Sequence, residues 1–200
     1  ACRTDDEAAL SDSSTSADPT TTSASSTPTT SAPLASSTVA PETTAESAEE
    51  ALPAGAALDV AFTYTAGASD RGPARNPYVA VWVEDADGAL VATLSVWYNP
   101  PKGERWIHEL SDWYSAANGS DVDAVTGATR PSGTYRVGWD GTDDGGGAVA
   151  PGEYTVFVES AREHGPHSVT SGSIVLGAAA STVAFDDDGE LSAVTATYSV

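Results

Sequence analysis

The segment Leu58-Asp59-Val60-Ala61-Phe62-Thr63-Tyr64 carries large apolar side chains at every second position, with smaller or polar residues between them. This period of two is typical of a β-strand that buries one face. Similar segments follow at short intervals and are separated by turns rich in Gly and Asp, such as Asp85-Ala86-Asp87-Gly88. The predicted strands cover residues 58–64, 77–84, 90–98, 133–140, 153–160, 168–176, 182–185 and 191–199. This pattern predicts an all-β fold, an immunoglobulin-like antiparallel β-sandwich.

The stretch 104–117 departs from the strand pattern. Trp106, Leu110 and Trp113 recur there at spacings of four and three, which would place them on one face of a helix. We therefore expect one short helix in this stretch, inserted between strands of the sandwich.

The N-terminal part of the chain has a different composition. Residues 3–56 are dominated by Ser, Thr, Ala, Pro and acidic residues, with scarcely any large apolar side chain between Leu10 and Leu52. Such a segment cannot bury enough apolar surface to fold. We interpret residues 1–56 as a disordered tether that precedes a single domain, residues 57–200.

The charge balance narrows the range of partners. The chain has 29 acidic and 8 basic residues, for a net charge of −21. Because a nucleic-acid-binding surface needs a basic stripe, this composition argues against nucleic acid as a partner. Cys2 is the only cysteine of the sequence, so an internal disulfide and a Cys-x-x-Cys-His haem attachment are excluded within it.

The surroundings of Cys2 resemble the lipidation site of bacterial lipoproteins. The small residue Ala1 precedes it and a long polar tract follows. In that class a signal peptidase cuts just before a lipid-modified cysteine. The resemblance implies an extracytosolic protein anchored to the cell membrane through a lipid on Cys2, whereas an incidental thiol is the alternative reading.

A second resemblance lies in Asp123-Ala124-Val125-Thr126-Gly127-Ala128-Thr129. It is similar to the acceptor motif of extracytosolic bacterial flavoproteins, in which an ApbE-type flavin transferase links the phosphate of FMN to the final Ser or Thr hydroxyl. The resemblance implies covalent FMN on Thr129. Gly127 and Ala128 would leave the approach open, and Asp123 and Thr126 would hold a turn through hydrogen bonds to the backbone.

Two further roles are our own inference rather than part of the motif. Arg130 follows directly and is expected to pair with the phosphodiester. Trp106, Trp113 and Tyr114 are close in sequence to the motif, and one of them is expected to stack on the flavin ring. The alternatives are an ordinary polar loop at Thr126 to Thr129 and core packing for the aromatic residues.

Two resemblances cover most of the domain. The run Trp139-Asp140-Gly141-Thr142-Asp143-Asp144-Gly145, continued by Pro151-Gly152-Glu153-Tyr154-Thr155-Val156, resembles a repeat of the immunoglobulin-like domain of flagellar hook-capping proteins. The wider stretch 79–177, including Glu159-Ser160-Ala161-Arg162-Glu163, resembles domain of unknown function family 2271. That bacterial extracytosolic family is often linked with PepSY-type membrane proteins and flavin transferases, which implies a redox or iron-related role.

The histidines form a weaker group. His164 and His167 are joined by Gly165-Pro166 and could, together with His108, ligate a transition metal, because imidazole suits iron, copper or zinc. The alternative is that they are plain surface residues. Neither a nucleophile elbow nor a phosphate-binding glycine loop is present, so the sequence gives no support for a hydrolase.

Together these patterns predict a lipid-anchored extracytosolic electron carrier. FMN on Thr129 would pass electrons between a membrane donor, such as a PepSY-type protein, and an acceptor, while the protein supplies placement and electrostatics. A non-redox surface module with an immunoglobulin-like fold and a periplasmic metal-binding accessory are the alternatives.

Overall fold

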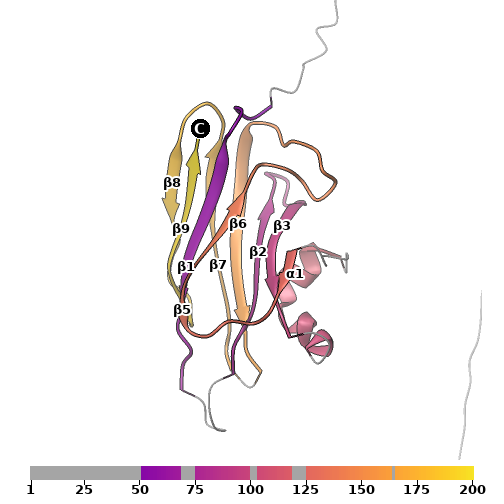
Figure 1. The fold of residues 1–200 in the computed structure, drawn as a ribbon, viewed down its shortest axis with the longest axis vertical. Helices are drawn as coiled ribbons and strands as arrows, with labels where there is room; N and C mark the ends of the chain where they lie inside the picture. Colours follow the sequence, from indigo (N-terminus) through magenta and orange to yellow (C-terminus); the bar gives the residue numbers. More distant parts are fainter. Residues whose placement is uncertain (1–50, 69–74, 100–102, 119–124, 164) are drawn as a thin grey trace, which may run out of the picture. The chain divides into compact units, whose positions relative to one another are not determined.

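The computed structural model describes residues 51–68, 75–99, 103–118, 125–163 and 165–200. The strands are β1 (Ala57–Tyr64), β2 (Tyr78–Glu84), β3 (Leu90–Trp97), β4 (Thr126–Gly127), β5 (Gly133–Trp139), β6 (Gly152–Ala161), β7 (His167–Leu176), β8 (Ser181–Ala184) and β9 (Leu191–Ser199). They form two sheets that pack face to face (Figure 1). The strand orders are β5-β1-β9-β8 in the smaller sheet and β4-β3-β2-β6-β7 in the larger one.

The predicted sandwich is confirmed. Each of the eight predicted strands is found, and the bounds agree with the prediction to within one residue. Neighbouring strands are antiparallel except for β3 and β4, which run parallel. The strand β4 was not predicted, because two residues are too few to show any hydrophobic period.

The main core lies between the two sheets. In β1 the side chains at alternate positions, Leu58, Val60, Phe62 and Tyr64, are fully buried, as the period of two predicts. They meet residues of the same kind from the larger sheet, including Val81 of β2. The alternating stretch 58–64 therefore contributes four side chains to the smaller sheet's side of the interior.

The strand β2 is buried on both faces. Its residues Val79, Val81 and Val83 face the main core, whereas Tyr78 and Trp82 belong to a second cluster on the outer face of the larger sheet. This explains why residues 78–83 read as an unbroken apolar run rather than an alternation. An outer face of this kind needs a cover.

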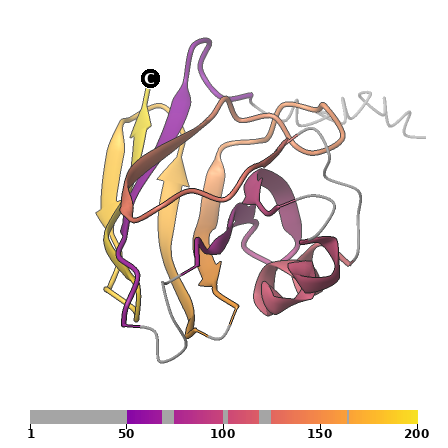
Figure 2. The same ribbon diagram turned by 60° about the horizontal axis from the view of Figure 1, so that its bottom comes forward.

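Two short helices supply that cover. They are a 3₁₀ helix, η1 (Glu104–Glu109), and an α-helix, α1 (Ser111–Ala116). Figure 2 shows both on the side of the larger sheet that faces away from β1 and β9. Leu110 and Trp113 are buried in the second cluster, and Trp106 packs against it as a partly buried residue.

One short α-helix is confirmed in the stretch 104–117, but it covers only the second half, and the first half is the 3₁₀ helix η1. Leu110 has φ −79° and ψ 69°, outside the helical region, so the helical backbone is interrupted between η1 and α1. The apolar stripe nevertheless stays on one side, because the three apolar residues all pack on the outer face of the sheet.

The residues before β1 already contact the domain. Leu52 packs against the main core and Ala56 is buried within it. Residues 1–50, which hold Cys2 and most of the predicted tether, lie outside the described residues. Among the residues that are described, no helix has both the length and the apolar character needed to cross a membrane.

Candidate functional site

The segment that holds Thr129 is attached to the edge of the larger sheet. In β4, Thr126 pairs with Val96 and Gly127 pairs with Trp97 of β3. The carbonyl of Gly127 also accepts a hydrogen bond of 2.9 Å from the backbone N–H of Tyr98. The backbone leading to Thr129 is therefore fixed by sheet pairing, while Asp123 lies outside the described residues.

Thr129 lines a small cavity. The residue is half-buried, whereas Ala128 before it is exposed. The cavity has a volume of about 350 Å³, and its lining residues are Arg75, Asn76, Tyr78, Asn99, Thr129 and Glu163. Arg75 contributes the positive charge of this lining, and its Nη1 lies 3.1 Å from Oε2 of Glu163. Thr129 and an arginine thus line the same polar recess.

Arg130, which was expected beside the phosphate on Thr129, packs against aromatic rings instead. Its guanidinium lies over the ring of Trp97, 4.6 Å from the centroid, and 5.6 Å from the centroid of Tyr135. Arg130 is not among the residues that line the cavity of Thr129. The cation beside that hydroxyl is Arg75, which the sequence did not single out because it lies far from the motif along the chain.

The three aromatic residues proposed to stack on the flavin, Trp106, Trp113 and Tyr114, lie in different surroundings. Trp113 is only 2% exposed, and its Nε1 donates a 3.2 Å hydrogen bond to Oγ1 of Thr93, so its ring has no face open to a flavin. This burial favours the alternative of core packing for Trp113. Tyr114 is 42% exposed, and it lines neither the cavity of Thr129 nor the one beside it.

Trp106 is the candidate that remains near Thr129. It lines a second cavity of about 250 Å³, together with Tyr78, Glu109, Arg162, Glu163 and Gly165. Tyr78 and Glu163 also line the cavity of Thr129, so the two recesses adjoin. Trp106 and Thr129 therefore line adjoining recesses.

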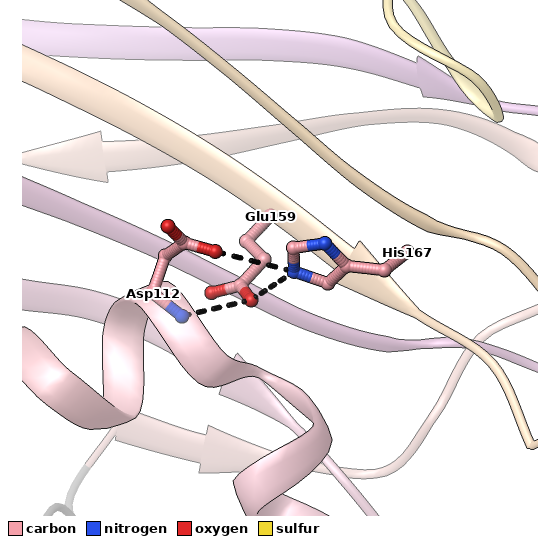
Figure 3. Close-up of side chains that lie close together, drawn as sticks. All are labelled: Asp112, Glu159 and His167. Atoms are coloured by element: carbon pink, nitrogen blue, oxygen red, sulfur yellow. Dashed lines mark hydrogen bonds and ion pairs between the residues drawn. The ribbon is translucent and has the colours of Figure 1, made fainter.

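Two of the three candidate histidines, His108 and His167, are described, and each lies beside carboxylates of its own. His108 lies exposed on η1, with Nε2 3.9 Å from Oε1 of Glu109. His164 lies outside the described residues. His167, the first residue of β7, instead meets two carboxylates, Asp112 and Glu159 (Figure 3).

Glu159 organises this group. It lies on β6, is 0% exposed and points to the outer face of the larger sheet, where α1 begins. Its Oε2 accepts the backbone N–H of Trp113 at 2.8 Å, and Oε1 accepts that of Asp112 at 3.2 Å. A side chain from the sheet thus satisfies donors of the first turn of α1 that the helix itself leaves open.

The same carboxylate faces the imidazole of His167. Nε2 of His167 lies 2.5 Å from Oε1 of Glu159 and 3.3 Å from Oδ2 of Asp112. Burial raises the pKa of Glu159, and this effect exceeds the opposing hydrogen bonds from Trp113, His167 and Asp112. Of these residues the sequence reading had named only His167 as a candidate. The signal available for Glu159 was a charged residue that directly follows the apolar run Val156-Phe157-Val158 of β6.

A buried ion pair lies beside the second cavity. Arg162 and Glu190 have side chains that are only 2% and 6% exposed, and Nη2 of Arg162 lies 2.6 Å from Oε1 of Glu190. Glu190 also accepts a hydrogen bond of 2.9 Å from the hydroxyl of Tyr64. The guanidinium of Arg162 is therefore already paired where it borders the cavity.

Comparison with known proteins places these features within a family. Residues 59–193 match the family described as "Predicted periplasmic protein (DUF2271)". No curated protein and no solved structure matches the chain. The matched range covers more than half of the 200 residues. It includes all the residues that line the two cavities, as well as Asp112, Glu159 and His167. The chain therefore belongs to the DUF2271 family, whose description as periplasmic indicates an extracytosolic location.

Proposed function

We propose that this protein is an extracytosolic electron carrier with FMN attached through a phosphoester to Thr129. The observation that carries the proposal is the position of Thr129. Its side chain is half-buried at a polar cavity that also contains Arg75, on a backbone tied to the edge of the larger sheet. A flavin transferase would have to bring a bulky dinucleotide up to this hydroxyl, and a position at the sheet edge favours that approach.

The attachment reaction balances with FAD as the donor. The Oγ1 of Thr129 forms a bond to the phosphorus of the FMN half, the pyrophosphate bond breaks, AMP leaves, and the hydroxyl proton is released. Arg75 is the group that would pair with the resulting phosphodiester, because a guanidinium binds phosphate oxygens through charge-assisted hydrogen bonds. At present Nη1 of Arg75 lies 3.1 Å from Oε2 of Glu163. Because the Arg75 side chain is exposed, exchanging Glu163 for a phosphate would cost little free energy.

The adjoining cavity suits the ring system. Trp106 lines this cavity, and Tyr78 lines both recesses. The guanidinium of Arg105 lies 5.1 Å from the centroid of the Trp106 ring, so a flavin stacking on that face would displace it. Volumes of about 350 Å³ and 250 Å³ together fall in the range of small-molecule sites. The flavin would supply the electron transfer, and the chain would hold it and set its surroundings.

The charges of this surface predict the direction of the redox potential. Glu109 and Glu163 line the second cavity, and the guanidinium of Arg162 is neutralised by Glu190. Acidic surroundings disfavour an anionic reduced flavin, so we expect a redox potential below that of free FMN.

The proposal implies two protein partners, an ApbE-type flavin transferase and a PepSY-type membrane redox protein. A lipid on Cys2 would anchor the chain to the membrane.

The test is intact-protein mass spectrometry after co-production with an ApbE-type transferase and Mg²⁺ in an exported form. We expect the wild type to gain the mass of one FMN less water and to become yellow. Thr129→Ala should remain unmodified, Thr129→Ser should be modified because it keeps a hydroxyl, and Thr134→Ala, which changes an exposed threonine of β5, should behave as the wild type. A colourless wild type, in cells where a known acceptor is flavinylated, would reject the proposal. A non-redox surface module would then be the favoured function.

A further inference from the structure

Three side chains from separate elements converge on the outer face of the larger sheet. Asp112 comes from α1, Glu159 from β6 and His167 from β7, and one ligand atom of each lies within 4.8 Å of the other two (Figure 3). We propose that they bind a divalent first-row transition-metal ion. This inference does not depend on flavin attachment, because none of the three lines the cavity of Thr129 or the one beside it.

The ligand chemistry fits such an ion. One imidazole nitrogen with two carboxylate oxygens is a donor set used for zinc, iron and manganese. Tetrahedral metal bonds of about 2.0 to 2.2 Å place neighbouring ligand atoms about 3.3 to 3.6 Å apart. Here Nε2 of His167 is 3.3 Å from Oδ2 of Asp112, which already matches, and 2.5 Å from Oε1 of Glu159, so the exposed imidazole would have to move outward by about 1 Å to admit an ion.

The site is fixed on its inner side and open on its outer side. Glu159 is held by two backbone N–H groups of α1 and by complete burial, which keeps Oε1 directed at His167. His167 and Asp112 have side chains that are 39% and 51% exposed, and Asp112 also borders an open groove of about 950 Å³. An ion can therefore enter from solvent and keep water in its remaining positions.

The electrostatics favour a cation. A buried carboxylate is costly unless its charge is compensated, and Glu159 is 0% exposed. The imidazole of His167 is shared between two carboxylates, so it cannot compensate both. Capping of α1 accounts for the burial of Glu159, but it gives no reason for the carboxylate of Asp112 to approach the same nitrogen of His167.

The sheet register also relates this site to the second cavity. Tyr78, which lines that cavity, is paired with Ala161 of β6, and Ala161 is paired with His167 of β7. Two strand spacings separate the backbones of Tyr78 and His167, about 10 Å. An ion held here would therefore lie on the same face of the sheet as the proposed flavin ring.

The test uses the full chain without a histidine tag and with Cys2→Ser, which removes its only thiol. After treatment with a chelator and dialysis, Zn²⁺ is titrated by calorimetry, with Co²⁺ absorption as a second probe. We expect one ion per chain in the parent, and at least about tenfold weaker binding in His167→Ala and Asp112→Asn. The matched control is His108→Ala, an exposed histidine that also lies next to a carboxylate and should leave binding unchanged.

The same proteins distinguish loss of a ligand from loss of the fold. Thermal unfolding without metal should be similar in the parent, Asp112→Asn and His108→Ala, while Zn²⁺ should raise Tm in the parent and in His108→Ala only. Parent protein that takes up neither Zn²⁺ nor Co²⁺ stoichiometrically would overturn the inference. Folded His167→Ala that binds as tightly as the parent would overturn it as well.

Discussion

Arg162 and Glu190 join the two sheets by a bidentate ion pair in the interior. Nε and Nη2 of Arg162 donate to Oε2 and Oε1 of Glu190 at 3.1 and 2.6 Å. Arg162 directly follows β6 of the larger sheet, and Glu190 directly precedes β9 of the smaller one. Tyr64 at the end of β1 and the backbone N–H of Gly67 complete the hydrogen bonds to the carboxylate.

We predict that Glu190→Gln lowers the free energy of unfolding by about 3 to 5 kcal/mol, because removing one member of a buried pair leaves the other charge without compensation. Urea unfolding at pH 7 measures the change. The control is Arg75→Gln, which breaks an ion pair whose arginine side chain is 66% exposed. That change should cost less than about 1 kcal/mol. Equal losses in the two variants would contradict a structural role for the buried pair.

Acid should weaken the same contact. Burial alone would raise the pKa of Glu190, but hydrogen bonds from Arg162, Gly67 and Tyr64 outweigh it and hold the pKa below the usual range. A depressed carboxylate pKa adds stability above the unfolded value, about 4.3, and that stability is lost as pH falls through the folded value. We therefore expect the stability of the wild type to fall more steeply below about pH 4.3 than that of Glu190→Gln. Parallel curves in urea unfolding from pH 7 to pH 3 would show that Glu190 is not the group responsible.

The strands were predictable because each carries its own evidence. In β1 the alternation ending at Tyr64 can be read without knowing its neighbours, and in β2 the unbroken apolar run already indicates burial on both faces. The interruption at Leu110 was not predictable, since the spacing of Trp106, Leu110 and Trp113 fits a continuous helix. Local pattern fixes which residues face the core, but not whether the backbone stays helical between them.

The site was less predictable because it depends on register. Glu159 and His167 approach each other only because β6 and β7 pair with Ala161 opposite His167. Asp112 joins them only because α1 begins over that part of the sheet. In the same way Arg75 reaches the cavity of Thr129 from a distant part of the chain. A sequence motif could point to Thr129, but not to the residues that surround it.

Gly127→Ala should separate recognition of the acceptor segment from folding. A Cβ at Gly127 would meet nothing closer than Cδ1 of Trp97 at 3.9 Å, which is ordinary contact. We expect its free energy of unfolding to stay within about 1 kcal/mol of the wild type. Flavin incorporation by a transferase should nevertheless fall, because the added methyl group narrows the approach to Thr129. Incorporation at the rate of the wild type, measured by mass spectrometry over time, would mean that the transferase does not need glycine there.

Trp106 should report the position of the flavin ring. If the ring occupies the cavity that Trp106 lines with Tyr78, stacking on the indole quenches flavin fluorescence. We therefore expect flavinylated Trp106→Leu to be brighter than the flavinylated wild type at equal flavin absorbance. The matched control is Tyr114→Leu, since Tyr114 is exposed and lines neither cavity. Equal brightness in all three proteins would place the ring elsewhere while leaving attachment at Thr129 intact, because attachment is measured separately by mass.

A ring near Trp106 would also lie on the outer face of the larger sheet, where Tyr78 and His167 are two strands apart. Adding Zn²⁺ to the flavinylated protein should then alter its fluorescence in the wild type but not in His167→Ala.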